Sequence, residues 1–169
     1  MSVIEKVLQK MIEFDEGDAK RIQHFTKVYC YAHLIAVEEG LDEQTMQILD
    51  LASIVHDIGI LPAEEKYGYH NGKIQEQIGP AYAGELLREF DIDEEIVKRV
   101  EFLVGHHHTY QGVDSIDWQI LLEADFLVNS FEKNMSQKAI MDTVQNVFQT
   151  KSGVRLCKLM YRLPDEMEA

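Results

Sequence analysis

The chain has 169 residues, of which 46% are hydrophobic and 27% are charged. This balance predicts one folded domain with a substantial core. The 16 basic and 30 acidic residues leave a formal charge of −14. That charge excludes a general nucleic-acid binder, because such a protein needs a basic surface to displace counterions from phosphates. A small anionic substrate is still allowed, since a bound metal can supply positive charge locally.

The sequence carries no signal for export or for insertion into a membrane. Residues 1–6 lack the basic region and apolar stretch of a signal peptide, and the chain has no run of about 18 apolar residues. Its two cysteines, Cys30 and Cys157, have no zinc-ligand spacing, and the helical pattern around Cys30 predicts a buried side chain. We therefore expect a protein of the reducing cytoplasm, without disulfides and without a membrane partner.

Apolar residues recur at helical spacing through nearly the whole chain, and strand signals are poor. The pattern predicts an all-α fold, a single-domain helical bundle of about six to eight helices over residues 1–169. Its core is expected at about 18–130, with C-terminal helices over 136–163.

Capping residues indicate where the helices begin and end. Asp18, Asp42 and Asp93 are suited to N-caps, and Gly40 is suited to a helix end. The expected helices cover about 2–14, 18–40, 42–57, 74–90, 93–106, 116–132 and 137–150, with a last turn or two over 154–163. Pro80 is expected to kink its helix or to mark its true start.

Residues 59–72 contain three glycines, a proline and an asparagine. This composition predicts a loop. Because the segment directly follows His56-Asp57, we expect it to act as a lid or a substrate loop.

The pair His56-Asp57 ends an apolar run, 48–55, and precedes Ile58-Gly59. A neutral imidazole and a carboxylate are both ligands for a divalent metal. Neighbours on a helix point about 100° apart, so both reach one ion only where the helix is distorted or ends. Gly59 is expected to allow that ending through its freedom in φ. The alternative is an ordinary helix C-terminus, where the dipole favours His.

Other histidines and one carboxylate extend this candidate site. His24 and His33 are nine residues apart on one helix, so they lie on opposite faces and cannot share a metal; we expect His33 to be structural. The run His106-His107-His108 either turns into the site or only complements a helix dipole. Asp125 stands among seven apolar residues, where a carboxylate is costly unless it meets a metal, an arginine or a helix N-terminus.

Three segments resemble the HD-domain superfamily of metal-dependent phosphohydrolases, and the resemblance covers about residues 18–130. The segments are Arg21-Ile22-Gln23-His24, Ala52-Ser53-Ile54-Val55-His56-Asp57-Ile58-Gly59 and Glu123-Ala124-Asp125-Phe126-Leu127. Their order and spacing fit the pattern H…HD…D. The resemblance implies an all-α fold in which a divalent metal is bound by His24, His56, Asp57 and Asp125.

Some members of that superfamily carry further ligands: a His before a Pro in the next helix, and a His-His pair at the end of the helix after it. Here His106-His107 resembles the pair, and Gly79 takes the place of the single His. Glu76, one turn before Gly79, is expected to replace the missing ligand or to transfer protons, with a solvated surface role as the alternative. We therefore expect one tightly bound metal, with Glu76, His106 and His107 as catalytic groups.

Two departures disfavour hydrolysis of cyclic dinucleotides. Superfamily members with that activity usually have Lys after HD-x-G, where this chain has Ile60. They also have Gly-Tyr-Pro after the His-His pair, where this chain reads Gln111-Gly112-Val113-Asp114.

The expected function is hydrolysis of a small phosphate ester, such as a nucleotide, by metal-activated water. Mixed nitrogen and oxygen ligation does not choose among Mn, Fe, Co, Ni, Zn and Mg. Lys27, Lys66 and Lys73 are candidates to bind the phosphate, with plain surface lysines as the alternative. Two other functions stay open: a di-iron oxygenase of the HD type, and a non-catalytic metal- or ligand-binding module. The oligomeric state also stays open.

Overall fold

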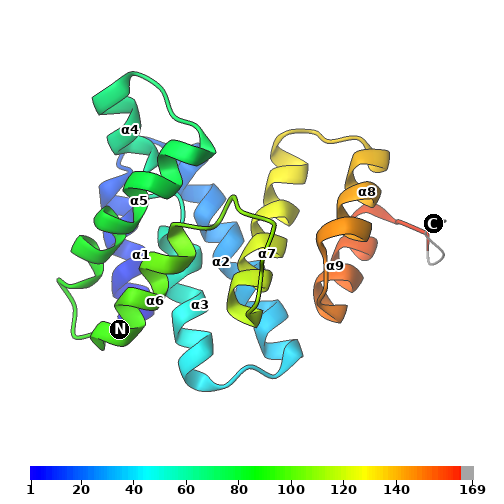
Figure 1. The fold of residues 1–169 in the computed structure, drawn as a ribbon, viewed down its shortest axis with the longest axis horizontal. Helices are drawn as coiled ribbons and strands as arrows, with labels where there is room; N and C mark the ends of the chain where they lie inside the picture. The colour runs from blue at the N-terminus through cyan, green and yellow to red at the C-terminus, as the bar shows by residue number, and fades with distance from the viewer. Residues whose placement is uncertain (165–169) are drawn as a thin grey trace.

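The computed structural model describes residues 1–164, and every regular element in this range is a helix (Figure 1). The all-α class predicted from the sequence is confirmed. The helices are α1 (Val3–Phe14), α2 (Ala19–Glu39), α3 (Glu43–Val55), α4 (Ile60–Tyr67), α5 (Gly72–Leu87), α6 (Glu94–Val104), α7 (Ile116–Glu132), α8 (Gln137–Val147) and α9 (Lys151–Tyr161).

The capping residues define several of these boundaries. The side chains of Asp18, Asp42 and Asp93 each accept a hydrogen bond from a backbone N–H in the first turn of α2, α3 and α6. Gly40 ends α2 with a φ of 73°, in the left-handed region that glycine adopts without strain. These predicted caps are confirmed.

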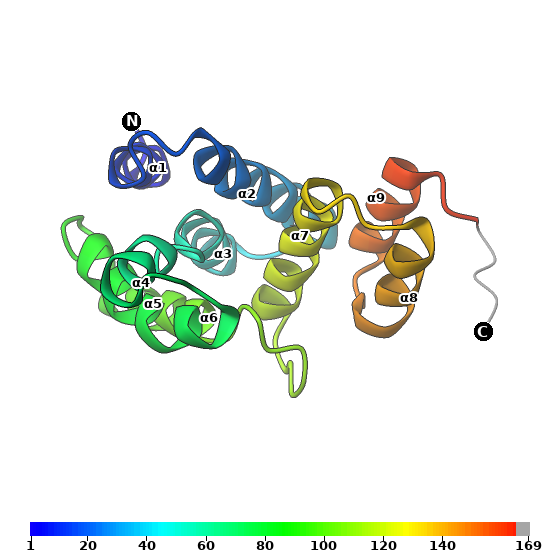
Figure 2. The same cartoon turned by 90° about the horizontal axis from the view of Figure 1, so that it is seen from above.

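The core is built around α3 and α7 (Figure 2). All residues from Ile48 to Val55 in α3 are buried, as are all those from Asp117 to Val128 in α7. Helix α3 packs against α1, α2, α6 and α7, and α2 packs against both α3 and α7. Helices this deeply buried have almost no solvent face, so their polar side chains must find partners inside the bundle.

The expected loop over 59–72 contains a helix, α4, so the loop prediction was wrong for Ile60–Tyr67. Pro62 lies in the first turn of α4, where the missing N–H has no helical partner to lose. Gly68 ends α4 with a φ of 76°. The proline and the glycine therefore mark the two ends of a short helix, and only residues 68–71 connect it to α5.

Two further boundaries differ from the expectation. Helix α5 begins at Gly72 and continues through Pro80, so the proline does not mark its start. The last turn or two expected over 154–163 is an eleven-residue helix, α9, which begins at Lys151 after an N-cap at Thr150.

Cys30 is exposed, so the prediction that it is buried was wrong, whereas Cys157 is buried. Cys30 lies two positions from both Val28 and Ala32, which are fully buried on α2. At about 100° per residue, a side chain halfway between them along the chain turns to the opposite face of the helix.

The stretch Glu43–Tyr67 is long and apolar enough to cross a membrane by length and composition alone. In the structure, 72% of its most apolar window is buried inside the bundle. A core helix passes the same test of length and hydropathy as a membrane span. The burial of α3 on all sides accounts for the apolar composition of this stretch.

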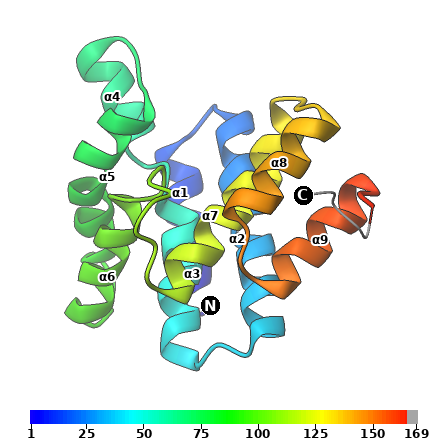
Figure 3. The same ribbon diagram turned by 45° about the vertical axis from the view of Figure 1, so that its right-hand side comes forward.

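Helices α8 and α9 form a hairpin on the side of α2 and α7 that lies away from α5 and α6 (Figures 1 and 3). Glu123 of α7, which is fully buried, joins this hairpin to the core. Its carboxylate accepts hydrogen bonds from the backbone N–H groups of Gln149 and Thr150, from the Thr150 hydroxyl and from the Gln119 amide. Three of these four hydrogen bonds come from the connection between α8 and α9, which is thus tied to α7 through one buried carboxylate.

We predict that Glu123→Ala lowers the free energy of unfolding by about 3 kcal/mol, because it leaves buried N–H groups without an acceptor. Chemical denaturation measures the loss. Glu13→Ala, which removes an exposed carboxylate from α1, is the control and should change stability by less than about 0.5 kcal/mol. Equal stability of the two variants would contradict the role of Glu123.

Candidate metal centre and cavity

The turn between α3 and α4 carries His56 and Asp57. Its backbone hydrogen bonds join residues three apart, from Ile58 N to Val55 O and from Ile60 N to Asp57 O, both at 3.0 Å. This tighter winding brings the two neighbouring side chains together, and His56 Nε2 lies 3.4 Å from Asp57 Oδ2. The distortion that two adjacent ligands require is therefore present at this turn.

Gly59 is needed at this turn for a reason other than the expected one. Its φ is −71°, which any residue can adopt. A Cβ at this position would lie 3.1 Å from Cα of Gly79 and 3.2 Å from the carbonyl oxygen of Gln75. Gly59 therefore lets α5 cross directly against the turn, and its freedom in φ is not used.

The four residues implied as metal ligands meet at one place, although they come from α2, the α3–α4 turn and α7. His24 Nε2 lies 3.3 Å from His56 Nε2, 3.1 Å from Asp125 Oδ1 and 3.3 Å from Asp57 Oδ2. The side chains of His56 and Asp125 are 0% and 4% exposed. The structure thus brings together the whole set named from the sequence.

His107, in the turn after α6, faces the same space. Its Nε2 lies 3.4 Å from Asp57 Oδ1 and has no hydrogen-bond partner, although the side chain is fully buried. Asp57, His107 and His108 form one group of potential metal ligands, and His24, His56 and Asp57 form another. Asp57 belongs to both groups.

The imidazole rings are held from behind through Nδ1. His24 Nδ1 lies 2.8 Å from a carboxylate oxygen of Glu132. His56 and His107 each donate from Nδ1 to the backbone carbonyl three residues earlier, at 2.8 and 2.7 Å. With the proton on Nδ1, the lone pair of each Nε2 points into the site. Three lone pairs and two carboxylates facing one another fit a divalent metal ion.

Each charged group of the cluster shifts the pKa of its neighbours. Burial disfavours a charged His56, but the carboxylates of Asp57 and Asp125 outweigh burial and raise the pKa of His56 well above its usual value. Burial likewise disfavours the charged carboxylates, but His56 beside Asp57 and His24 beside Asp125 lower the pKa of both carboxyls. Both aspartates are therefore ionised at neutral pH, as metal ligands must be.

His106, predicted as a catalytic group, does not line the site. Its ring stacks on Phe102 at 4.1 Å between centroids, and its Nδ1 donates to the Phe102 carbonyl at 2.6 Å. The His-His pair at the site is therefore His107-His108 instead of His106-His107. One residue of shift in a turn is enough to send a side chain to another face.

Glu76 also has a role other than the predicted one. Its Oε1 accepts hydrogen bonds from the backbone N–H of His108 at 2.9 Å and from the hydroxyl of Thr109 at 2.8 Å. Glu76 thus holds the turn after α6 against α5. It neither replaces the missing ligand at Gly79 nor lines the cavity beside the cluster.

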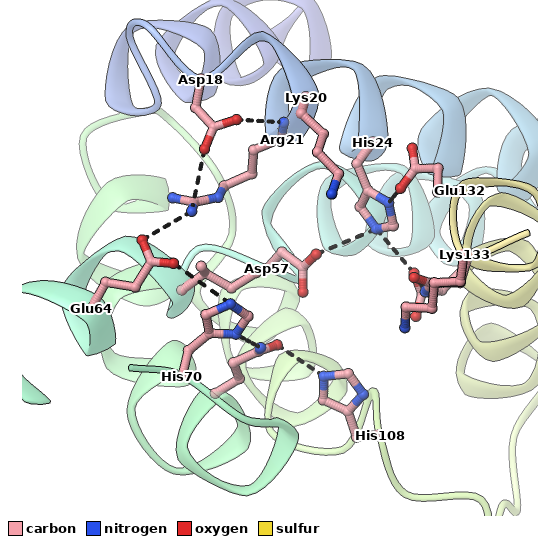
Figure 4. Close-up of a pocket in the computed structure, with 14 residues that line it drawn as sticks. Asp18, Lys20, Arg21, His24, Asp57, Glu64, His70, His108, Glu132 and Lys133 are labelled. Atoms are coloured by element: carbon pink, nitrogen blue, oxygen red, sulfur yellow. Dashed lines mark hydrogen bonds and ion pairs between the residues drawn. The ribbon is translucent and has the colours of Figure 1, made fainter. Parts of the chain in front are cut away.

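A cavity of about 380 Å³ opens beside the cluster (Figure 4). Its lining residues are Asp18, Lys20, Arg21, His24, Asp57, Ile60, Glu64, His70, Gln75, His108, Asp125, Asn129, Glu132 and Lys133. The cavity thus has His24, Asp57 and Asp125 of the cluster in its wall, and any small molecule that enters it meets these ligands.

The lysines predicted to bind phosphate do not line this cavity. Lys27 forms an ion pair with Glu132 at 2.7 Å. Lys66 lies over the ring of Tyr67, 5.2 Å from its centroid, and Lys73 is exposed in the first turn of α5. The placement of all three differs from the prediction.

Lys20 and Lys133 line the cavity instead, and the sequence analysis missed both. Helical spacing from a predicted metal ligand could have indicated each of them. Lys20 lies four residues before His24, which is one turn on the same helix face, and Lys133 lies about two turns after Asp125.

A chain of polar contacts closes one wall of the cavity (Figure 4). Gln75 accepts a hydrogen bond from His108 Nε2 at 2.9 Å and donates one to His70 Nδ1 at 2.8 Å. His70 Nε2 lies 3.5 Å from Glu64, which in turn pairs with Arg21 at 3.1 Å. These residues come from α2, α4, α5 and two connections, so no single segment of the sequence predicts this chain of contacts.

Arg21 is held by three carboxylates. Its guanidinium lies 3.4 Å from Asp15, 3.3 Å from Asp18 and 3.1 Å from Glu64. Asp15 is buried, and its Oδ2 has no hydrogen-bond partner. Burial raises the pKa of Asp15 to about 6, although Arg21 opposes the shift.

His33 lies apart from the cluster, as its spacing from His24 predicts. Its Nδ1 lies 3.0 Å from a carboxylate oxygen of Asp50, and its side chain is 45% exposed. His33 is therefore a suitable control for His24 on the same helix.

Comparison with protein families matches residues 21–136, about two thirds of the chain, to the HD domain. The chain belongs to the HD-domain family. Its structure is similar to that of a predicted HD superfamily hydrolase from an uncultured Thermotogales bacterium, with a TM-score of 0.64 and 25% identity. That similarity covers 94% of this chain and 83% of the other. Comparison with curated proteins gives no match.

The packing of this HD domain explains its departure at Gly79. A Cβ on Gly79 would lie 2.9 Å from a methyl group of Val104. The backbone of Gly59 is also close, within 4 Å of that Cβ. An imidazole at position 79 would therefore require Val104 to move or α5 to shift away from α6.

We predict that His107→Ala weakens the binding of a divalent metal by roughly 10–100-fold, because a buried nitrogen facing Asp57 is lost. His106→Ala removes a neighbouring imidazole that points elsewhere and should bind metal like the wild type. Competition with a chelating dye measures both affinities. A larger loss in His106→Ala than in His107→Ala would contradict the placement.

A second prediction concerns pH. The pKa of Asp15 is about 6 in the fold and 3.8 ordinarily, so its charge destabilises the fold above about pH 6, and this cost disappears as the pH falls towards 4. Asp15→Asn should therefore raise the free energy of unfolding at pH 8 by on the order of 1–3 kcal/mol, and change it little at pH 4.

Denaturation of wild type and Asp15→Asn at both pH values measures this difference. The control is Glu16→Gln, which neutralises an exposed neighbour. A gain in Asp15→Asn that is the same at pH 4 and pH 8 would show that the titration of Asp15 is not its cause.

Proposed function

We propose that the protein is a metal-dependent phosphohydrolase that acts on a small phosphate ester. The observation that carries the proposal is the convergence of three imidazole Nε2 atoms and two carboxylates at the wall of an open cavity. Membership of the HD-domain family and similarity to a structure described as a predicted HD superfamily hydrolase support the hydrolytic class.

In this proposal, His24, His56, Asp57 and Asp125 hold the metal, with His107 beside them. The ion belongs to the set Mn, Fe, Co, Ni, Zn and Mg. Bound there, it would supply Lewis acidity and activate water for attack on phosphorus.

The protein's own residues orient this centre and limit access to it. Glu132 holds the ring of His24 from behind, and Asn129 donates a hydrogen bond to Asp125 Oδ1 at 2.8 Å. His56 and His107 are fully buried, so water and substrate approach from the cavity side only. We propose a cytoplasmic location, which the free thiols of Cys30 and Cys157 support.

A di-iron oxygenase of the HD type is the second candidate, because Asp57 belongs to two groups of potential ligands. Two irons per chain and a spectrum that changes with oxygen would favour this function. A single redox-silent metal would remove it.

The proposed function is tested by measuring metal content and turnover together. We expect one tightly bound divalent metal per chain by elemental analysis, and release of inorganic phosphate from a member of a panel of nucleotides and other phosphate esters. His24→Gln should lose both properties and His33→Gln should keep both. Bound metal without turnover across the panel would reject the phosphohydrolase and favour a non-catalytic metal-binding module.

A further inference from the structure

Two lysines stand at the mouth of the cavity on either side of His24 (Figure 4). Lys20 comes from the first turn of α2, and Lys133 from the end of α7. Within residues 1–164, no carboxylate forms an ion pair with either ammonium group. The third cation of the lining, Arg21, is already engaged by three carboxylates.

The carboxylates of the lining are turned to partners of their own. Asp18 and Glu64 face Arg21, and Glu132 faces His24 and Lys27. Asp57 and Asp125 point into the cluster, where a divalent metal would balance their two charges. What remains free to meet a ligand in the cavity is the pair of ammonium groups on Lys20 and Lys133.

We propose that Lys20 and Lys133 bind the terminal phosphate of the substrate and make the protein selective for phosphomonoesters. This inference rests on the proposed function and narrows its substrate class. A phosphomonoester carries close to two negative charges at neutral pH, which matches two lysines. A phosphodiester carries one charge and leaves one lysine without a partner.

The carboxylates that line the cavity disfavour substrates with more than one phosphate. A second or third phosphate in a cavity of about 380 Å³ lies close to Asp18, Glu64 or Glu132, which line it. The cations beside these carboxylates are already engaged by them, so a further phosphate there meets carboxylate oxygens and no free positive charge. The cavity therefore combines an attractive feature for one phosphate with a repulsive one for more.

The experiment uses the metal-loaded protein and esters that share one organic body. We expect kcat/KM for the monoester to exceed that for the diphosphate, the triphosphate and the methyl diester by about ten-fold or more. Lys20→Ala and Lys133→Ala should each raise KM for the monoester about 5–10-fold, with a smaller effect on kcat, and leave metal content unchanged.

Binding of inorganic phosphate, measured by calorimetry, gives a readout that does not depend on turnover. Both lysine variants should bind phosphate about 5–10-fold more weakly than the wild type. Lys73→Ala is the matched control, because it removes the same charge from a lysine outside the cavity, and its phosphate affinity should not change.

The outcomes separate this inference from the function on which it rests. Equal phosphate affinity in Lys20→Ala, Lys133→Ala and Lys73→Ala, or a preference for a diphosphate or a diester, would overturn the inference while turnover of any ester upholds the phosphohydrolase. Phosphate binding that depends on both lysines, with no turnover of any ester, would support the phosphate site and reject the hydrolase.

Discussion

The structure depends on holding two ionised carboxylates and three imidazoles together inside an apolar bundle. Burying such charge is costly unless opposite charge or hydrogen bonds compensate for it. Here the compensation is shared among α2, α7 and the two turns that carry His56 and His107, so these elements cannot shift independently. Protons on the rings or a bound cation supply the positive charge. Only a cation does so while leaving each Nε2 lone pair directed into the site.

A second constraint, the contact of α5 with the α3–α4 turn, determines where one wall of the cavity lies. Gly59 and Gly79 let the two backbones meet, and this fixes α5 against the turn. From that position Glu76 holds the turn after α6, and Gln75 holds the ring of His108. Gln75 and His108 therefore form a fixed wall of the cavity on the α5 side, and α2 and the end of α7 line it on the other side.

Features that depend on neighbouring residues in the chain could be predicted from the sequence. The caps at Asp18 and Asp42 depend on neighbouring residues only, and the opposite directions of His24 and His33 follow from helical geometry. Features that depend on the packing of one helix against another could not be predicted from the sequence. The pair at the site is His107-His108 and not the predicted His106-His107, in a turn that Glu76 of another helix holds. The need for glycine at 59 arises from α5, which no local pattern reveals.

The net charge of −14 means that the free lysines at the cavity mouth are local positive charges on an acidic protein. The overall field of an acidic protein repels anions at long range, but it is screened over about 8–10 Å at physiological ionic strength. An anion is therefore bound by the charges within a few ångströms of it, which in the proposed substrate complex would be Lys20, Lys133 and a metal on the cluster. A long polyanion extends beyond that zone and meets the acidic surface. Under the proposed function, the same charge distribution that would admit one small phosphate would oppose nucleic acids and polyphosphates.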